Sequence, residues 1–179
     1  MVCTKLIKLV DMVILETDRL RIEEMTLNDG VFIQELMNTK GWLEFIGDRN
    51  IDSLKKAEDY ITDKFIWAYK NWGYGPYKIV RKECNTSIGI VTLVKRDYLE
   101  FLDIGFAVLP KYEGKGFIKE ASLAILNYAQ TKLDQKKVFA FTEVDNVRSI
   151  RLLKSIGLIQ DGFILPDGEE EELLFFATK

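Results

Sequence analysis

The segment from Asp103 to Ala121, DIGFAVLPKYEGKGFIKEA, constrains the fold of this chain more than any other segment. An apolar run ends at Pro110, two glycines follow at Gly114 and Gly116, and a helical pattern begins after them. This order predicts a strand, a tight turn and the start of a helix. The first amides of a helix have no partner within the helix, and glycines let an anion approach them closely. The segment therefore predicts a site for a phosphate group, although two glycines after a strand also occur in ordinary turns.

Two familiar nucleotide-binding signatures are absent from the sequence. Lys119 stands where GxGxxG requires its third glycine, and no GxxxxGK[ST] string occurs. Neither a Rossmann dehydrogenase nor a P-loop NTPase is therefore expected.

Length and composition indicate one compact domain with few charge-driven partners. A chain of 179 residues is long enough to bury a substantial core, and nothing in it suggests a second core. Lys and Arg number 25 against 28 Asp and Glu, so we expect no nucleic-acid partner. The chain has no histidine, which removes the commonest metal ligand and the commonest base near neutral pH. We expect no metal, and proton transfer by carboxylates, tyrosines, serines or water.

The N-terminus and the cysteines bear on the compartment. Only Cys3 and Cys84 occur, with no CxxC pair, which favours a reducing cytoplasm. Asp11 interrupts the first apolar run and no cleavage pattern follows, so we expect no export signal. No run of about 18 apolar residues exists, so no membrane span is expected. We expect residues 1–12 to form a disordered extension and residues 13–179 to form the single domain.

The periodicity of apolar residues predicts an α+β domain whose sheet is mixed, mostly antiparallel and flanked by helices. A helix from about Leu27 carries Phe32, Leu36 and Met37 on one face, and a longer helix, capped by Asp52 or Ser53, ends at Gly73. Its apolar stripe, which we assign to the core, consists of Leu54, Ala57, Ile61, Phe65, Ala68 and Trp72. Strands are expected at 13–23, 77–81, 87–94, 102–109, 137–142, 158–165 and 173–178, and further helices at 116–131 and 149–155. Residues 169–172 are expected to form a solvated turn.

The glycine loop and several other segments resemble one known family. Lys111-Tyr112-Glu113-Gly114-Lys115-Gly116 is similar to the Q/R-x-x-G-x-G/A loop of the GCN5-related N-acetyltransferase (GNAT) superfamily. Two further segments resemble the ribosomal-protein alanine acetyltransferase subgroup of that superfamily. The opening strand of the subgroup is similar to LETDRLRIEEMTLND at 15–29, and its first interhelical loop is similar to GWLEFIGDRNI at 41–51. DNVRSIRLL at 145–153, with IGL at 156–158, resembles the DNxxSIxLLxxxGF block, with Leu158 in place of the usual aromatic residue.

The resemblance implies an enzyme that moves the acetyl group of acetyl-CoA to a primary amine by direct transfer in a ternary complex. The expected acceptor is a protein N-terminus or a small amine such as an antibiotic or a polyamine, and the expected state is a monomer or homodimer. A route through an acetyl-cysteine is disfavoured because Cys3 and Cys84 lie outside the motifs. The alternative function is a non-catalytic acyl-CoA sensor with the same fold. Cofactor hydrolysis, or transfer to any amine of a panel, would separate the two functions.

The resemblance also implies which residues contact the coenzyme A moiety. Two departures bear on its affinity: Lys111 replaces a planar Gln or Arg, and Glu113 brings a negative charge towards a pyrophosphate. Lys115 and Lys119 could offset that charge. The expected cofactor-binding residues are Val108, Leu109, Lys111, Glu113, Gly114, Lys115, Gly116, Phe117, Ile118 and Asn146.

Two residues are candidates for proton transfer, because the amine must be neutral to attack the thioester and a thiolate must leave. Asp103 resembles the position of the glutamate base in histone acetyltransferases of the family, and its alternative role is that of a strand-edge acid paired with a neighbouring lysine or a turn amide. Ser149 matches the NxxS serine proposed as the proton donor in the ribosomal-protein subgroup. Asn146 and Ser149 also have the spacing of a helix cap, and for Asn146 we expect a cap together with a cofactor contact.

The acceptor side is expected to be formed by aromatic residues and one acid, Trp42, Phe45, Asp48 and Tyr74. Ring faces and a carboxylate attract a cationic amine. Aromatic residues at such positions could equally complete the core, which we favour for Trp72 and Tyr77.

Overall fold

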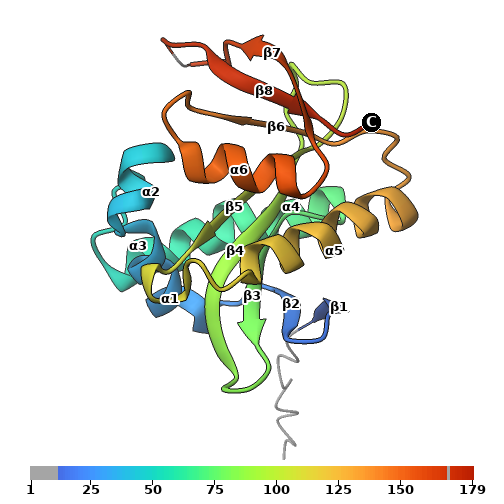
Figure 1. Ribbon diagram of the computed structural model, residues 1–179. Coiled ribbons are helices and arrows are strands. Elements are labelled where there is room, and N and C mark those ends of the chain that lie inside the picture. Colours follow the sequence, from blue (N-terminus) through green and yellow to red (C-terminus); the bar gives the residue numbers. More distant parts are fainter. Residues whose placement is uncertain (1–11, 169) are drawn as a thin grey trace, which may run out of the picture.

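The computed structural model describes residues 12–168 and 170–179 and shows one eight-stranded sheet with helices on both faces (Figure 1). The strand order is β1-β2-β3-β4-β5-β6-β8-β7, and β5 and β6 are the parallel pair. The predicted mixed, mostly antiparallel α+β fold is thereby confirmed. The strands are β1 Val13–Glu16, β2 Leu20–Glu24, β3 Pro76–Arg81, β4 Thr86–Val94, β5 Asp103–Val108, β6 Phe139–Thr142, β7 Ile159–Ile164 and β8 Leu173–Ala177. The disordered extension predicted for residues 1–12, and Cys3 within it, lie almost wholly outside the described residues.

Two apolar clusters attach the helices to the two faces of the sheet. Side chains of α5 and α6, among them Ile125 and Leu153, form one cluster with β2 to β6 and β8. Side chains of α1 and α3, among them Ile33 and Ala57, pack with Ile90 in the other. The helices are α1 Gly30–Met37, α2 Lys40–Phe45, α3 Leu54–Tyr60, α4 Trp67–Trp72, α5 Phe117–Lys132 and α6 Val147–Ser155. Because both faces are covered, a central strand such as β3 is buried on both sides.

The long helix predicted before Gly73 exists, but it is not uniform. Ser53 caps it, its hydroxyl accepting from the Lys56 N–H at 3.4 Å, and Gly73 ends it at φ 76°. Between α3 and α4, the segment Ile61–Ile66 is π-helical. The predicted stripe is buried from Ala57 to Ala68, whereas Leu54 is 44% exposed.

Two elements differ from the sequence-based prediction. The expected strand 13–23 is two strands, because Thr17 turns the chain: its N–H donates to the Leu20 carbonyl at 2.9 Å and its hydroxyl accepts from the Leu20 N–H at 3.0 Å. The segment 41–51, expected to be a loop, contains most of α2. Thr39 caps this helix by accepting from the Trp42 N–H.

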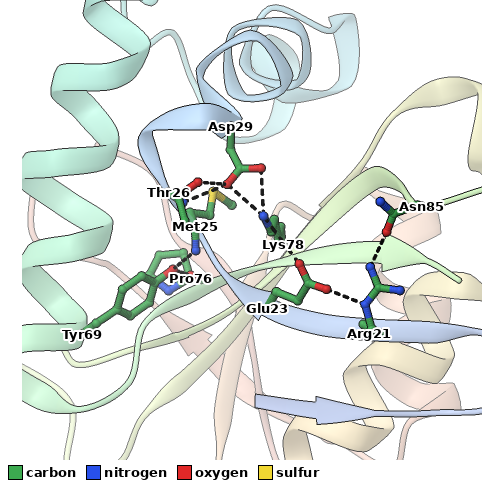
Figure 2. Close-up of polar contacts among 9 residues, drawn as sticks. All are labelled: Arg21, Glu23, Met25, Thr26, Asp29, Tyr69, Pro76, Lys78 and Asn85. Carbon is green, nitrogen blue, oxygen red and sulfur yellow. Dashed lines mark hydrogen bonds and ion pairs between the residues drawn. The ribbon is translucent and has the colours of Figure 1, made fainter. Parts of the chain in front are cut away.

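A row of charged side chains lies buried between β2, β3 and the start of α1 (Figure 2). The Lys78 ammonium is 3.0 Å from a carboxylate oxygen of Asp29 and 3.5 Å from one of Glu23. Glu23 also pairs with Arg21 at 2.6 Å. The Asp29 carboxylate accepts from the Thr26 N–H at 2.8 Å, which ties the same row to the turn before α1. These opposed charges connect the first helix to the sheet.

Candidate functional site

The two parallel strands of the sheet diverge along most of their length. Asp103 lies opposite Phe139, whose N–H donates to the Leu102 carbonyl at 2.8 Å. Beyond that pair β6 continues beside β8 (Figure 1), and β5 has no further strand on this side among the described residues. The Leu109 N–H donates towards β4, so strand alternation directs the N–H and C=O groups of Val108 towards the opening. Such an open edge can bind an extended chain that carries amides.

The glycine loop lies at the carboxyl end of β5, where the opening is widest. Gly114 and Gly116 adopt φ values of 70° and 77°, which favour glycine, and α5 begins at Phe117 immediately after them. A side chain at Gly114 would meet nothing within 4 Å, so the loop surface is open there. The first amides of α5 have no partner within the helix. The predicted strand, tight turn and helix start are confirmed, and the geometry suits a phosphate group.

Arg19 holds the glycine loop against the start of α5. Its Nε is 2.6 Å from the Glu120 carboxylate, its Nη1 donates to the Lys115 carbonyl at 3.1 Å, and its guanidinium lies 4.6 Å from the centre of the Phe117 ring. Thr17 donates to the same Glu120 carboxylate. Arg19 could not be recognised from the sequence, because its partners lie about a hundred residues further along the chain.

The charges that we expected on the loop have defined partners. Glu113 forms an ion pair with Arg148 at the start of α6, and this cation, rather than Lys115 or Lys119, offsets its charge. Lys111 lies 3.3 Å from the Glu35 carboxylate of α1. The Lys115 ammonium donates to the Lys111 carbonyl at 2.8 Å.

Leu109 and Ile118 have mainly supporting positions beside the loop. The Leu109 N–H donates to Ile88, its carbonyl accepts from Tyr112, and its side chain is buried against α1 and α3. The half-buried Ile118 side chain packs against the core on the α5 face. Both residues therefore fix the shape of the loop from within.

Asp103 lies at the closed end of the opening. Its side chain is buried, 4% exposed, and accepts from the Arg96 Nε at 2.8 Å. Burial raises the pKa of the Asp103 carboxyl, and the Arg96 guanidinium counteracts part of that rise. Asp103 is thus a paired strand-edge acid, as in our alternative interpretation, but its partner is an arginine of the β4–β5 loop and not the expected lysine or turn amide. Its role as a base stays a prediction.

Asn146 and Ser149 lie at the carboxyl end of β6, across the opening from the glycine loop. The Asn146 Oδ1 accepts from the Ser149 N–H at 3.1 Å, so the predicted cap is confirmed. Since the carboxyl ends of parallel strands meet at one edge of a sheet, α6 and the loop before α5 face the same opening.

The four expected acceptor residues do not form one wall. Trp42 is buried among α1 and α3, and Phe45 is half-buried one turn further along α2. Asp48 is exposed and accepts from the Asn50 N–H at 2.6 Å. Tyr74 packs against the other cluster, with its ring stacked 6.2 Å from Trp72. Tyr77 lies fully buried in the core, as we favoured.

The described residues include no helix long and apolar enough to cross a membrane. Within residues 12–168 and 170–179 there is also no group of three or more His, Cys, Asp or Glu side chains arranged to hold a metal ion.

Comparisons with known proteins agree with this geometry. The family model described as the acetyltransferase (GNAT) domain matches residues 19–159. The uncharacterized N-acetyltransferase YnaD of Bacillus subtilis is 25% identical over 161 residues, which cover 86% of this chain and 89% of YnaD. Among solved structures, ribosomal-protein-S5-alanine acetyltransferase from Vibrio fischeri superposes with a TM-score of 0.77 at 16% identity, over 92% of this chain and 94% of that one.

A second solved structure holds the cofactor that the resemblance implies. AAC(6')-Ib, in complex with Parmomycin and acetyl-CoA, superposes with a TM-score of 0.73 at 16% identity, over 90% of this chain and 93% of that one. GNAT acetyltransferases use acetyl-CoA to acetylate amines. With a family match that spans most of its length, this chain belongs to the GNAT acetyltransferase family and is an N-acetyltransferase.

Proposed function

We propose that this chain transfers the acetyl group of acetyl-CoA to a primary amine by direct attack in a ternary complex. The observation that carries the proposal is the opening between β5 and β6 with the glycine loop at its wide end. Acetyl-CoA is an extended molecule with amides in its chain and a pyrophosphate at one end. Its amides would bind the open strand edge, and its pyrophosphate would bind the free amides at the start of the helix.

The cofactor would supply an activated acyl group as a thioester, and the residues of the chain would hold it. The amides of Gly116, Phe117 and the following turn would bind the pyrophosphate, with Gly114 allowing close approach. The strand edge that ends at Val108 would bind the amide chain. Asn146, on the opposite side of the opening, is the remaining expected contact.

The first test of the proposal is thermal unfolding with and without acetyl-CoA. At about 100 times its dissociation constant, a ligand of the native state adds about 2.7 kcal/mol of stability, which raises the Tm of a domain of this size by about 5–10 °C. We expect that rise with acetyl-CoA and with free CoA, and none with NAD. The absence of a shift at millimolar acetyl-CoA would contradict the proposed cofactor site.

Ser149 is proposed to donate a proton to the departing thiolate. It lies in the first turn of α6, and the bond from its N–H to Asn146 fixes its backbone beside the opening. Loss of one hydrogen bond to a developing charge lowers turnover by about tenfold. We therefore expect Ser149→Ala to reduce kcat about tenfold with the same affinity for acetyl-CoA, measured by steady-state kinetics and by calorimetry. Full turnover in this variant would exclude the role.

The acceptor is proposed to be a protein N-terminus or a small-molecule amine. The two solved structures described above represent these classes: one is named for a ribosomal protein alanine, and the other is in complex with Parmomycin. The exposed Asp48 and the half-buried Phe45 are the expected residues that remain available to an acceptor on the α2 side. A panel of N-terminal peptides, polyamines and aminoglycosides, followed by release of free CoA thiol, would identify the class.

A non-catalytic acyl-CoA sensor remains the second candidate, and the Asp103–Arg96 ion pair is the observation that favours it. A carboxylate engaged by a guanidinium inside the protein is less available as a base. A sensor would show the thermal shift with acetyl-CoA but release no CoA with any amine of the panel.

A further inference from the structure

Arg148 joins the two sides of the opening at its wide end. It is the second residue of α6, which follows β6, and its Nη1 lies 2.5 Å from the carboxylate of Glu113, which follows β5. The Arg148 side chain is 84% exposed and that of Glu113 is 39% exposed. The ion pair therefore lies at the surface, where the two strands are furthest apart.

Glu113 lies beside the expected pyrophosphate site, so the cation that pairs with it lies there too. Glu113 directly precedes Gly114, which has no side chain and faces open space. A pyrophosphate bound by the amides after Gly114 would therefore lie close to the Glu113 carboxylate and to the cation that holds it. Since an exposed ion pair contributes little stability, Arg148 can leave Glu113 at little cost.

We propose that Arg148 is a ligand of the cofactor's pyrophosphate and that Glu113 holds its guanidinium in place until the cofactor binds. This inference rests on the proposed function, because it requires acetyl-CoA at the glycine loop. A planar guanidinium donates two parallel hydrogen bonds to a phosphate, and the two phosphates of a pyrophosphate together carry more negative charge than one carboxylate does. When the cofactor binds, the Arg148 guanidinium leaves the Glu113 carboxylate and pairs with the pyrophosphate.

A simpler role for Arg148 is to neutralise Glu113, and four proteins separate the two roles: the wild type, Arg148→Gln, Glu113→Gln and the double variant. If Arg148 only neutralises Glu113, its removal has no effect once Glu113 is neutral. If Arg148 binds phosphate, its removal weakens CoA binding in both backgrounds. This double-mutant cycle isolates the contact with the ligand from the contact within the protein.

The dissociation constant for CoA, measured by titration calorimetry, is the readout. We expect Arg148→Gln to weaken binding about tenfold, since a charged hydrogen bond is lost. Glu113→Gln is expected to strengthen binding about two- to fivefold, because the competing carboxylate is removed. The double variant is expected to bind at least about tenfold more weakly than Glu113→Gln alone. Equal affinity of the double variant and Glu113→Gln would overturn the proposal.

Lys154→Gln is the matched control, because it removes one positive charge from the same helix about 9 Å further along the axis. We expect its affinity for CoA to be unchanged, and a tenfold loss in this control would mean that general electrostatics account for the effect.

Dephospho-CoA, which keeps the pyrophosphate and lacks the 3′-phosphate, identifies the phosphate involved. The Arg148→Gln penalty is expected to persist with dephospho-CoA, and its disappearance would overturn the assignment to the pyrophosphate. Failure of the wild type to bind CoA at all would instead contradict the proposed function.

Discussion

Replacing Lys78 by methionine is expected to lower the free energy of unfolding by about 3–5 kcal/mol, because it leaves buried negative charge without its cation. Lys78 is 4% exposed and lies between the carboxylates of Glu23 and Asp29, both of which are also buried. Methionine retains much of the length of the side chain and removes the ammonium. Urea unfolding followed by fluorescence, with linear extrapolation to water, measures the change.

Lys56→Met provides the matched control for this variant. Lys56 also pairs with a carboxylate, that of Asp52 at 2.6 Å, but its side chain is 50% exposed. We expect a loss of less than about 1 kcal/mol, since solvent screens such a pair. Adding Asp29→Asn to Lys78→Met is expected to recover much of the lost stability, because Glu23 keeps its ion pair with Arg21 and Asp29 is then neutral. A loss for Lys78→Met no larger than the control's would contradict the buried arrangement in Figure 2.

Replacing Asp103 by asparagine is expected to lower turnover by about 10²- to 10⁴-fold while leaving the affinity for acetyl-CoA unchanged, if Asp103 removes the proton from the amine. Burial raises the pKa of the Asp103 carboxyl above its ordinary value. The carboxylate is the form that accepts a proton. Wild-type kcat/KM should therefore fall as the pH drops through this raised pKa, which gives the pH profile an acidic limb. That acidic limb should be absent from the profile of Asp103→Asn.

Arg96→Gln separates the base from the ion pair, because it breaks the same contact and keeps the carboxylate. Loss of the guanidinium removes a group that favours the charged form, so the pKa of Asp103 should rise further and the acidic limb should move to higher pH. If Asp103 is only a structural partner, both variants should lose stability and neither should change the profile. That result would exclude Asp103 as the base.

Local sequence signals were sufficient for the parts of the site formed by consecutive residues. Gly114 and Gly116 adopt the left-handed conformation that a tight turn before a helix requires, and Ser53 and Asn146 cap the helices that they precede. Turns and caps depend on neighbouring residues, so the residue types alone indicate them.

Pairs between distant segments could not be predicted in this way. Arg148 and Glu113 are 35 residues apart, and Lys78 and Asp29 are 49 apart. Periodicity gives the face on which a residue lies, not its partner on another element. Lys78 was also concealed by the burial of β3 on both faces, because four consecutive residues of that strand are buried and the usual alternation is absent. The sequence did offer one signal, because a lysine within an apolar strand indicates a buried cation that needs a carboxylate partner.

The divergence of β5 and β6 changes what determines the spacing between two strands. In most of the sheet, backbone hydrogen bonds fix neighbouring strands at about 4.8 Å. Beyond Asp103 and Phe139 no such bonds hold β5 and β6, so the gap is kept by the volume of the side chains beneath α5 and α6. Substitutions in that shared core can therefore widen or narrow the opening between β5 and β6 without breaking a backbone hydrogen bond. If acetyl-CoA binds in this opening, as we propose, the length of acyl chain that the protein accepts depends on core packing as well as on the residues beside the opening.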